Sequence, residues 1–268
     1  MNFKPVIKWS GSKRSQASTI VSLAPDSYRT YFEPFIGGGS ILYALNPPAA
    51  ICGDICSPLI DLWKVIQSAP DSLIDQYRKD WLRLQEEGHP VFYEIRDHFN
   101  KTQDPRSLFF LSRTCVNGLI RFNAKGEFNN SLHHSRPGIN PDRLKPIVDS
   151  WSERIQGVEF LNADYRITIA DASKGDFVYL DPPYLNTKGR YYGGIEFSEF
   201  LSCLEDLNMR GVKYALSFDG YRGDKDYSAP IPKELYKRKE MLASGNSAFK
   251  KVQDKISEQV YESLYLNY

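Results

Sequence analysis

The stretch YFEPFIGGGSILYALNPPAAICGD, residues 31–54, decides the fold class of this chain. It begins with an apolar run, residues 31–35, that predicts a strand and leads into three glycines at 37–39. A helical segment and a second apolar strand follow, and that strand ends at Asp54. This order of strand, glycine-rich turn, helix, strand and acid is typical of a doubly wound α/β sheet that binds a nucleoside-bearing cofactor. We therefore expect an α/β fold of the Rossmann type.

Length and composition limit the class of protein. The 268-residue chain is 41% hydrophobic, which suits one large domain with an inserted subdomain. No apolar run approaches the about 18 residues of a membrane span, and the N-terminus lacks the apolar core of a signal peptide. The four cysteines have neither zinc-type spacing nor a nearby histidine pair, so we expect reduced thiols, no metal site and a cytoplasmic location. They are Cys52, Cys56, Cys115 and Cys203.

Charge is distributed unevenly along the chain. The net charge of +1 is not that of a protein that binds DNA through its overall charge. However, residues 1–30 carry five basic side chains against one acidic, and residues 101–145 carry eight against three. Such stripes are found both on phosphate-binding surfaces and on solvated charged faces, and charge alone leaves the two readings open.

The pattern after residue 56 changes from strands to amphipathic helices. Ser57-Pro58 and Asp104-Pro105 are helix-start signals, and apolar residues recur at helical spacing between them. Residues 121–129, RFNAKGEFN, alternate on either side of a glycine-containing turn and predict a β-hairpin. We therefore expect a mostly helical insertion that carries a basic hairpin. The predicted units are a catalytic domain, residues 1–56 and 156–268, and the inserted subdomain, residues 57–155.

Several strands of the predicted sheet end in an acid or in glycines. The sheet resumes after the insertion with expected strands at residues 158–161, 177–180, 212–218 and 260–266. In DFVYLDPPYLN, residues 176–186, the strand ends at Asp181 and at a stiff turn of two prolines. Parallel strands place their ligand crevice at their carboxyl ends. Because Gly37–Gly39, Asp54, Asp164 and Asp181 all fall at such ends, we expect them to form one site.

The glycine turn FIGGGSILY matches neither common phosphate-binding motif. It lacks the lysine of a P-loop and the third glycine of the NAD fingerprint. S-adenosylmethionine has no phosphate; it needs glycines that allow its methionine part to approach the backbone, and a carboxylate for its ribose hydroxyls. Gly37, Gly39 and Asp54 fit that requirement, so we expect S-adenosylmethionine to be the cofactor.

Six stretches of the chain resemble, in order, the Dam-type DNA adenine-N6 methyltransferases of the DPPY class. They are IKWSGSK at 7–13, FEPFIGGGS at 32–40, GDICSPLIDLW at 53–63, FYEIRDHFN at 92–100, SRTCVNGLIRFNAKGEFN at 112–129 and YLDPPY at 179–184. Together they span nearly the whole chain. The resemblance implies a Rossmann-like S-adenosylmethionine methyltransferase sheet, with the insertion as the DNA target-recognition subdomain.

The resemblance and the basic pattern together give an expected set of site residues. Those expected to bind the cofactor are Trp9, Lys13, Phe35, Gly37, Gly39, Asp54, Asp164, Tyr165 and Asp181. Those expected to contact double-stranded DNA are Lys8, Arg113, Asn117, Leu119, Arg121, Asn123, Lys125 and Asn129. The sequence leaves open whether a cognate restriction endonuclease is a partner, and we take a monomer as the default.

The chemistry of adenine methylation explains the DPPY turn. The lone pair of the exocyclic amine is delocalised into the ring, so the enzyme must hold the amine in line with an already strong electrophile. Asp181 is expected to accept one hydrogen of N6, the carbonyl of Pro182 the other, and Tyr184 to stack on the base. A duplex hides this amine, so we expect the adenine to flip out.

The chain departs from the family in the region that reads the target. Many members have an aromatic residue at the position of Val116, and the hairpin commonly continues as FNVPFG rather than FNNSLH, residues 128–133. GATC is therefore one candidate target and not an assured one. Two alternatives to DNA adenine methylation are methylation of an RNA adenine or a cytosine N4 amine, and a catalytically silent DNA-binding regulator on the same fold.

Overall fold

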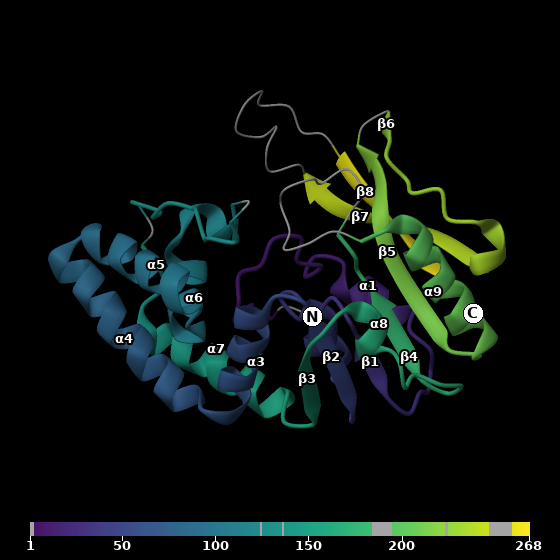
Figure 1. Cartoon of the computed structure of the whole chain (residues 1–268), viewed down its shortest axis with the longest axis horizontal. Coiled ribbons are helices and arrows are strands. Elements are labelled where there is room, and N and C mark those ends of the chain that lie inside the picture. The colour runs from purple at the N-terminus through teal and green to yellow at the C-terminus, as the bar shows by residue number, and fades with distance from the viewer. Residues whose placement is uncertain (1–2, 124, 136, 184–194, 223–224, 247–258) are drawn as a thin grey trace.

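The computed structural model describes residues 3–123, 125–135, 137–183, 195–222, 225–246 and 259–268. A sheet with helices on its faces lies beside a group of helices contributed by the middle of the chain (Figure 1). The helices are α1 (Ala17–Ser22), α2 (Ser40–Leu45), α3 (Ser57–Ser68), α4 (Pro70–Glu87), α5 (Pro90–Thr102), α6 (Pro105–Thr114), α7 (Pro141–Arg154), α8 (Tyr165–Thr168) and α9 (Phe197–Met209). The strands are β1 (Tyr31–Glu33), β2 (Ala50–Asp54), β3 (Val158–Asn162), β4 (Phe177–Leu180), β5 (Lys213–Arg222), β6 (Lys225–Asp226), β7 (Arg238–Asn246) and β8 (Gln259–Leu266). Short 3-10 turns span Val116–Gly118 and Lys233–Leu235.

The described strands form one sheet in the order β3-β2-β1-β4-β5-β8-β7, with β6 beside β5. Strands β1 to β5 are parallel, whereas β8 lies antiparallel between β5 and β7. The chain order reverses between β1 and β4, which are neighbours, so the connections after these strands leave on opposite sides and open a crevice at their carboxyl ends. This arrangement confirms the predicted doubly wound α/β fold and all six strands expected from the sequence.

The central strands are buried on both faces, which is why they read as continuous apolar runs. Tyr31 and Phe177 face the core that includes α1 and α2, whereas their neighbours Phe32 and Val178 face the core that includes α8 and α9. This alternation follows from the two-residue period of a strand. The sheet is therefore fixed from both sides, and the loops at its carboxyl ends start from rigid positions.

The helices of the inserted region all begin in the same way. Each of α3 to α7 has a proline in its first turn, where the missing N–H would have no partner within the helix. Side chains of Asp104 and Asn140 cap α6 and α7 by accepting backbone N–H bonds from Ser107 and Asp142. Helix α3 packs against β2 and β3 as well as against α6 and α7, so the hydrophobic core runs without a break from the sheet into the helices.

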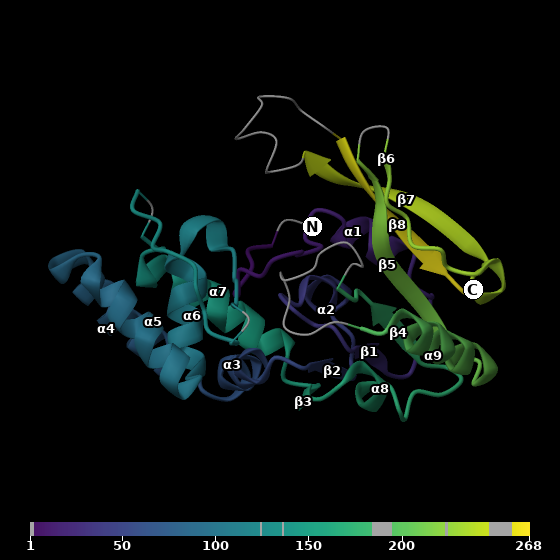
Figure 2. The ribbon, with the colours of Figure 1, turned by 45° about the horizontal axis from the view of Figure 1, so that its top comes forward.

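The predicted hairpin is confirmed. Phe122 and Phe128 pair across it, and the N–H of Asn129 donates to the carbonyl of Arg121 at 3.0 Å. Both rings pack against Phe99 of α5, so this apolar face anchors the hairpin to the helices. In Figure 2 the hairpin lies beside α5 and α6, toward the top of the view. In the residues that the structure describes, no helix is both long and apolar enough to cross a membrane.

Candidate active site

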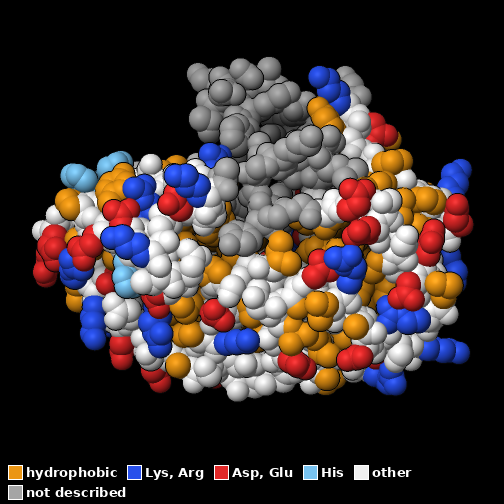
Figure 3. Space-filling model, viewed as in Figure 1, with side chains coloured by type: hydrophobic (Ala, Val, Ile, Leu, Met, Phe, Trp, Pro, Cys, Tyr) orange, Lys and Arg blue, Asp and Glu red, His pale blue; other side chains and the backbone are white. Residues whose placement is uncertain are grey.

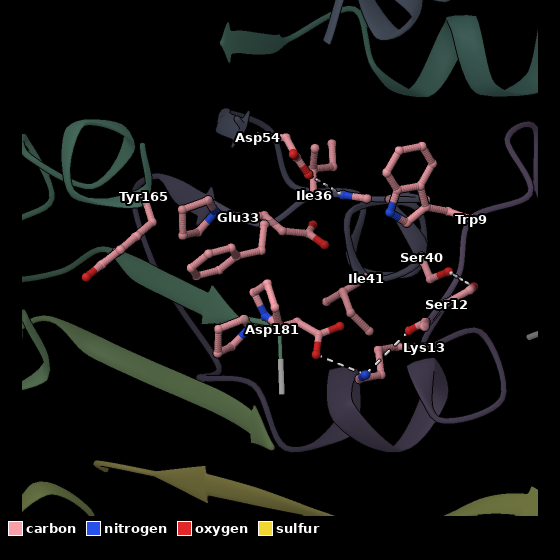
Figure 4. Close-up of a pocket in the computed structure, with 18 of the residues that line it drawn as sticks. Trp9, Ser12, Lys13, Glu33, Ile36, Ser40, Ile41, Asp54, Tyr165 and Asp181 are labelled. Carbon is pink, nitrogen blue, oxygen red and sulfur yellow. Dashed lines mark hydrogen bonds and ion pairs between the residues drawn. The ribbon is translucent and has the colours of Figure 1, made fainter. Parts of the chain in front are cut away.

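The strand ends that the sequence singled out converge on one cavity. It is lined by the 9–13 segment, the loop after β1, Asp54, Asp164 and the start of the turn after β4 (Figure 4). Its volume is about 970 Å³ when the part open to solvent is included. The structure therefore brings residues at or just after the ends of β1, β2, β3 and β4 together in one cavity, as expected.

The glycine loop is shaped by contacts with two tryptophans. Gly37 and Gly39 have positive φ angles of 45° and 63°, which favour glycine. A Cβ on Gly37 would lie 2.8 Å from Cδ1 of Trp9, and one on Gly39 would lie 2.9 Å from Cζ2 of Trp63. The indole N–H of Trp63 also donates to the carbonyl of Gly37 at 3.1 Å. The glycines thus allow close packing within the protein as well as access to the backbone from the cavity.

Asp54 ends β2 with its carboxylate beside this loop. Its Oδ2 accepts a bond from the N–H of Gly37 at 3.4 Å, and its Oδ1 accepts one from the N–H of Cys56 at 3.0 Å. Burial raises the pKa of Asp54 to about 6, although these bonds act in the opposite direction. The carboxylate is held rigidly by two backbone bonds, and its raised pKa leaves it mainly ionised at neutral pH.

A third part of the cavity wall is aromatic. The ring of Phe35 stacks on that of Tyr165, with centroids 5.4 Å apart. Asp164 caps the short helix α8 and accepts bonds from the backbone and the guanidinium of Arg166. Partial burial opposes ionisation of Asp164, but these bonds hold its pKa below the ordinary value. The wall therefore offers a flat apolar surface with a carboxylate beside it.

A buried cation links the turn after β4 to the N-terminal segment. The ammonium of Lys13 lies 2.9 Å from Oδ1 of Asp181 and 3.3 Å from Oε2 of Glu262 on β8. Burial acts to lower the pKa of Lys13, but the charges of Asp181 and Glu262 outweigh it, and the pKa is held above its ordinary value. The lysine stays protonated and fixes the orientation of Asp181.

One acid of the cavity was not predicted. Glu33, at the end of β1, accepts bonds at its Oε2 from the hydroxyl of Tyr31 at 2.8 Å and from the N–H of Leu42 at 3.1 Å. Burial raises the pKa of Glu33 to about 8, and the charge of Asp181 contributes to the rise. Glu33 is thus mainly protonated at neutral pH. Its position at the end of the first apolar strand, four residues before Gly37, was the sequence signal that could have identified it.

Comparison with known proteins decides the family. A family model described as D12 class N6 adenine-specific DNA methyltransferase matches residues 9–250. The chain belongs to this family. A type II methyltransferase of Methanocaldococcus jannaschii is 31% identical and is aligned over 100% of both chains. A type II methyltransferase of Lactococcus lactis subsp. cremoris is 28% identical over 88% of this chain and 86% of its own. A DNA adenine methylase of Vibrio cholerae is 30% identical over 77% and 76% of the two chains.

The protein is therefore an adenine-specific DNA methyltransferase, and DNA is its substrate. Membership of this family also selects DNA adenine methylation over the alternatives of RNA or cytosine amines. Membership of a methyltransferase family implies S-adenosylmethionine as the cofactor, which is also the cofactor expected from the glycine turn. The described residues contain no cluster of three or more His, Cys, Asp or Glu side chains that could hold a metal ion.

The methyltransferase exposes polar side chains along the hairpin and the turn that precedes it. Asn117, Arg121, Lys125 and Asn129 are exposed, and Leu119 is half-buried. Lys8 is also exposed and lies against this turn, because a Cβ on Gly118 would be only 2.6 Å from its Cδ. Figure 3 shows Lys and Arg side chains on the upper part of the helical region, intermixed with acidic ones.

Two expected DNA contacts of the methyltransferase have other partners in the structure. Arg113 is 5% exposed, and its guanidinium donates to the carbonyls of Pro5 and Val6 at 2.9 and 3.4 Å. Asn123 accepts bonds from the backbone N–H groups of Lys125 and Glu127 at 2.9 and 3.0 Å. The side chain of Arg113 therefore joins the N-terminal segment to α6, and that of Asn123 shapes the hairpin turn. Arg113 is buried, and the side chain of the half-buried Asn123 is already bonded within the hairpin, so we leave both out of the DNA contacts proposed below.

The end of the DPPY motif lies outside the described residues. Asp181 and Pro182 line the cavity, and Pro183 follows them. Tyr184 is not among the residues that the structure describes, so its stacking role stays a prediction.

Proposed function

We propose that the cavity binds S-adenosylmethionine and that the enzyme methylates the N6 amine of an adenine turned out of the DNA duplex. The observation that carries the proposal is the convergence of four strand ends on one cavity at the point where the strand order reverses. Asp181, the acid that the chemistry requires, lies at this point next to the expected cofactor site.

The lining of the cavity fits this cofactor. Carboxylates at Asp54 and Asp181 would repel the phosphates of a dinucleotide, whereas they suit a cofactor whose reactive centre is a cationic sulfonium. Asp54 would accept hydrogen bonds from the ribose hydroxyls, and Phe35 and Tyr165 would pack against the adenine. Trp9, Lys13 and the backbone of Gly37 and Gly39 would line the methionine part.

The residues after β4 then orient the target amine. When bound, S-adenosylmethionine supplies a methyl group on a sulfonium, which is a strong electrophile. Asp181 accepts one hydrogen of N6 and the carbonyl of Pro182 accepts the other, so that the nitrogen lone pair points toward the methyl group. Both acceptors also favour the positive charge that develops on nitrogen. Holding the amine in line can contribute up to about 7–11 kcal/mol to lowering the barrier.

The exposed polar face supports binding of the duplex. Arg121 and Lys125 would neutralise phosphates, while Asn117 and Asn129 would face the bases and Lys8 would read an outer base of the site. Leu119 lies on the same turn as Val116 and would take the place of the missing aromatic wedge. Turning the base out of the duplex costs a few kcal/mol, and stacking of that base on Tyr184 would offset about 1–3 kcal/mol of this cost.

The proposal is tested by transfer of labelled methyl from S-adenosylmethionine to unmethylated genomic DNA. Asp181→Ala should abolish transfer while DNA binding largely survives, and Asp171→Ala, an exposed aspartate outside the cavity, should behave like the wild type. Sequencing that maps N6-methyladenine would name the target, with GATC as one candidate. Transfer by the Asp181→Ala enzyme near the wild-type rate would show that the assigned mechanism is wrong.

A further inference from the structure

Glu262 reaches the active site from a strand that no sequence motif marked. It lies on β8, the antiparallel strand between β5 and β7. Acceptors around the Lys13 ammonium include Oδ1 of Asp181 at 2.9 Å, Oε2 of Glu262 at 3.3 Å and the carbonyl of Gly11 at 3.4 Å. An ammonium has three protons to donate, so Lys13 can serve several acceptors at once. Glu262 is thus one of the supports of the lysine.

The position of Glu262 is itself fixed. The hydroxyl of Ser244 on β7 donates to its Oε1 at 3.0 Å, while its Oε2 faces Lys13. Polar contacts therefore run from β7 through Glu262 and Lys13 to Asp181. The side chains of Lys13, Glu262 and Asp181 are 6%, 14% and 18% exposed, so water competes little for these contacts.

We infer that Glu262 is a positioning residue for methyl transfer, because it shares the charge of Lys13 with Asp181. The inference rests on the proposed function, in which Asp181 accepts a hydrogen of the adenine amine. A carboxylate that alone balances the charge of a buried ammonium is a weaker hydrogen-bond acceptor for another donor. Glu262 draws the ammonium partly toward β8, which keeps Asp181 both oriented and basic.

The test is the isosteric substitution Glu262→Gln, with Glu240→Gln as the matched control. Glu240 lies on β7, is ion-paired with Arg238 and is 40% exposed. At saturating enzyme and cofactor, single-turnover transfer to unmethylated genomic DNA should fall about tenfold or more in the Glu262→Gln enzyme. The affinity for DNA should not change, and the Glu240→Gln enzyme should match the wild type.

A second readout separates positioning from general support of the fold. Removing the negative charge of Glu262 strengthens the pairing of Lys13 with Asp181, so protonation of Asp181 becomes less favourable. Glu33, another titratable group whose charge is coupled to that of Asp181, is unchanged in this variant. The acid limb of the pH–rate profile should therefore move to lower pH in the Glu262→Gln enzyme. A merely structural role would lower the thermal stability but leave this limb in place.

The bond to Lys13 can also be followed without turnover. Protons of a buried, hydrogen-bonded ammonium exchange slowly, so a nitrogen-15 correlation spectrum should show a Lys13 signal in the wild type and lose it in the Glu262→Gln protein. Glu262→Asp, which keeps the charge but is one methylene shorter, should fall between the two and serves if the glutamine variant does not fold. A wild-type rate, acid limb and lysine signal in a folded variant would overturn the inference. If Asp181→Ala itself still transfers methyl, the proposed function fails first.

Discussion

Asp54 should make cofactor binding dependent on pH. Both of its oxygens accept backbone N–H bonds, yet burial keeps its pKa at about 6. Ribose hydroxyls donate to a carboxylate better when it is ionised. The affinity for S-adenosylmethionine should therefore be full above pH 6 and be lost as the pH falls below it.

The size of the effect follows from the pKa. If only the ionised form binds, the dissociation constant rises by a factor of about 2 at pH 6 and about 11 at pH 5, against about 1.1 at pH 7. Glu33, whose pKa is about 8, stays mainly protonated throughout this range. The α-amino group of the cofactor also stays protonated, because its ordinary pKa is about 7.7–8.0.

Isothermal titration calorimetry of S-adenosylmethionine between pH 5 and pH 7.5 measures this dependence without DNA. Asp54→Asn is the control, since its amide cannot titrate: binding should be weaker at neutral pH and nearly flat across the range. Two results would refute the reasoning. One is a wild-type affinity that stays constant between pH 5 and pH 7, and the other is an asparagine variant that keeps the wild-type slope.

Three further outcomes are expected. Gly39→Ala should lower the free energy of unfolding by about 2–4 kcal/mol in chemical denaturation, because of both its φ of 63° and the 2.9 Å approach to Trp63. Gly211→Ala, with a similar φ of 68° but no described neighbour closer than 3.7 Å to the added Cβ, should cost only about 1–2 kcal/mol, and equal losses would contradict the packing argument. In fluorescence anisotropy over a range of salt, Arg121→Ala should reduce the log–log salt slope by about 1, whereas Arg113→Ala should lower stability and leave the slope unchanged. The pKa of Glu33 is about 8 in the folded protein and 4.5 ordinarily. The unfolded chain therefore ionises first, and the wild type loses stability as the pH rises from 4.5 to about 8. Glu33→Gln should then gain in thermal stability relative to the wild type from pH 5 to pH 9, and a constant difference would show that Glu33 does not titrate there.

The sequence predicted the site residues that stand at or near the ends of strands, because a local pattern of residues marks each of them. Gly37, Asp54 and Asp181 each stand at the end of an apolar strand, and parallel strands bring such ends to one edge of the sheet. The pattern therefore predicted their convergence without any knowledge of the contacts between them. It could not supply the second reason for the glycines, because the approach of Trp9 and Trp63 to the loop is a fact of packing between distant segments.

Side chains whose partners are distant in sequence were not predictable in the same way. Arg113 lies in a basic stripe, and composition cannot tell an arginine that faces phosphates from one that is buried on carbonyls. In the structure it joins α6 to Pro5 and Val6, more than a hundred residues earlier. Its burial and its carbonyl partners indicate that Arg113 serves stability, whereas the exposed Arg121 stays a proposed DNA contact.

The antiparallel strand β8 shows most clearly what a one-dimensional pattern omits. An apolar strand near the C-terminus was expected, but its insertion between β5 and β7 depends on pairing along two neighbours. That insertion brings Glu262 to within 3.3 Å of Lys13, from a position 249 residues later in the chain. A strand at the outer edge of the sheet would not bring Glu262 to Lys13. The order of the last strands thus determines the charge around Asp181, the acceptor that we propose for the adenine amine. On this proposal, a variant of β8 should change catalysis without touching any of the motifs that identify the family.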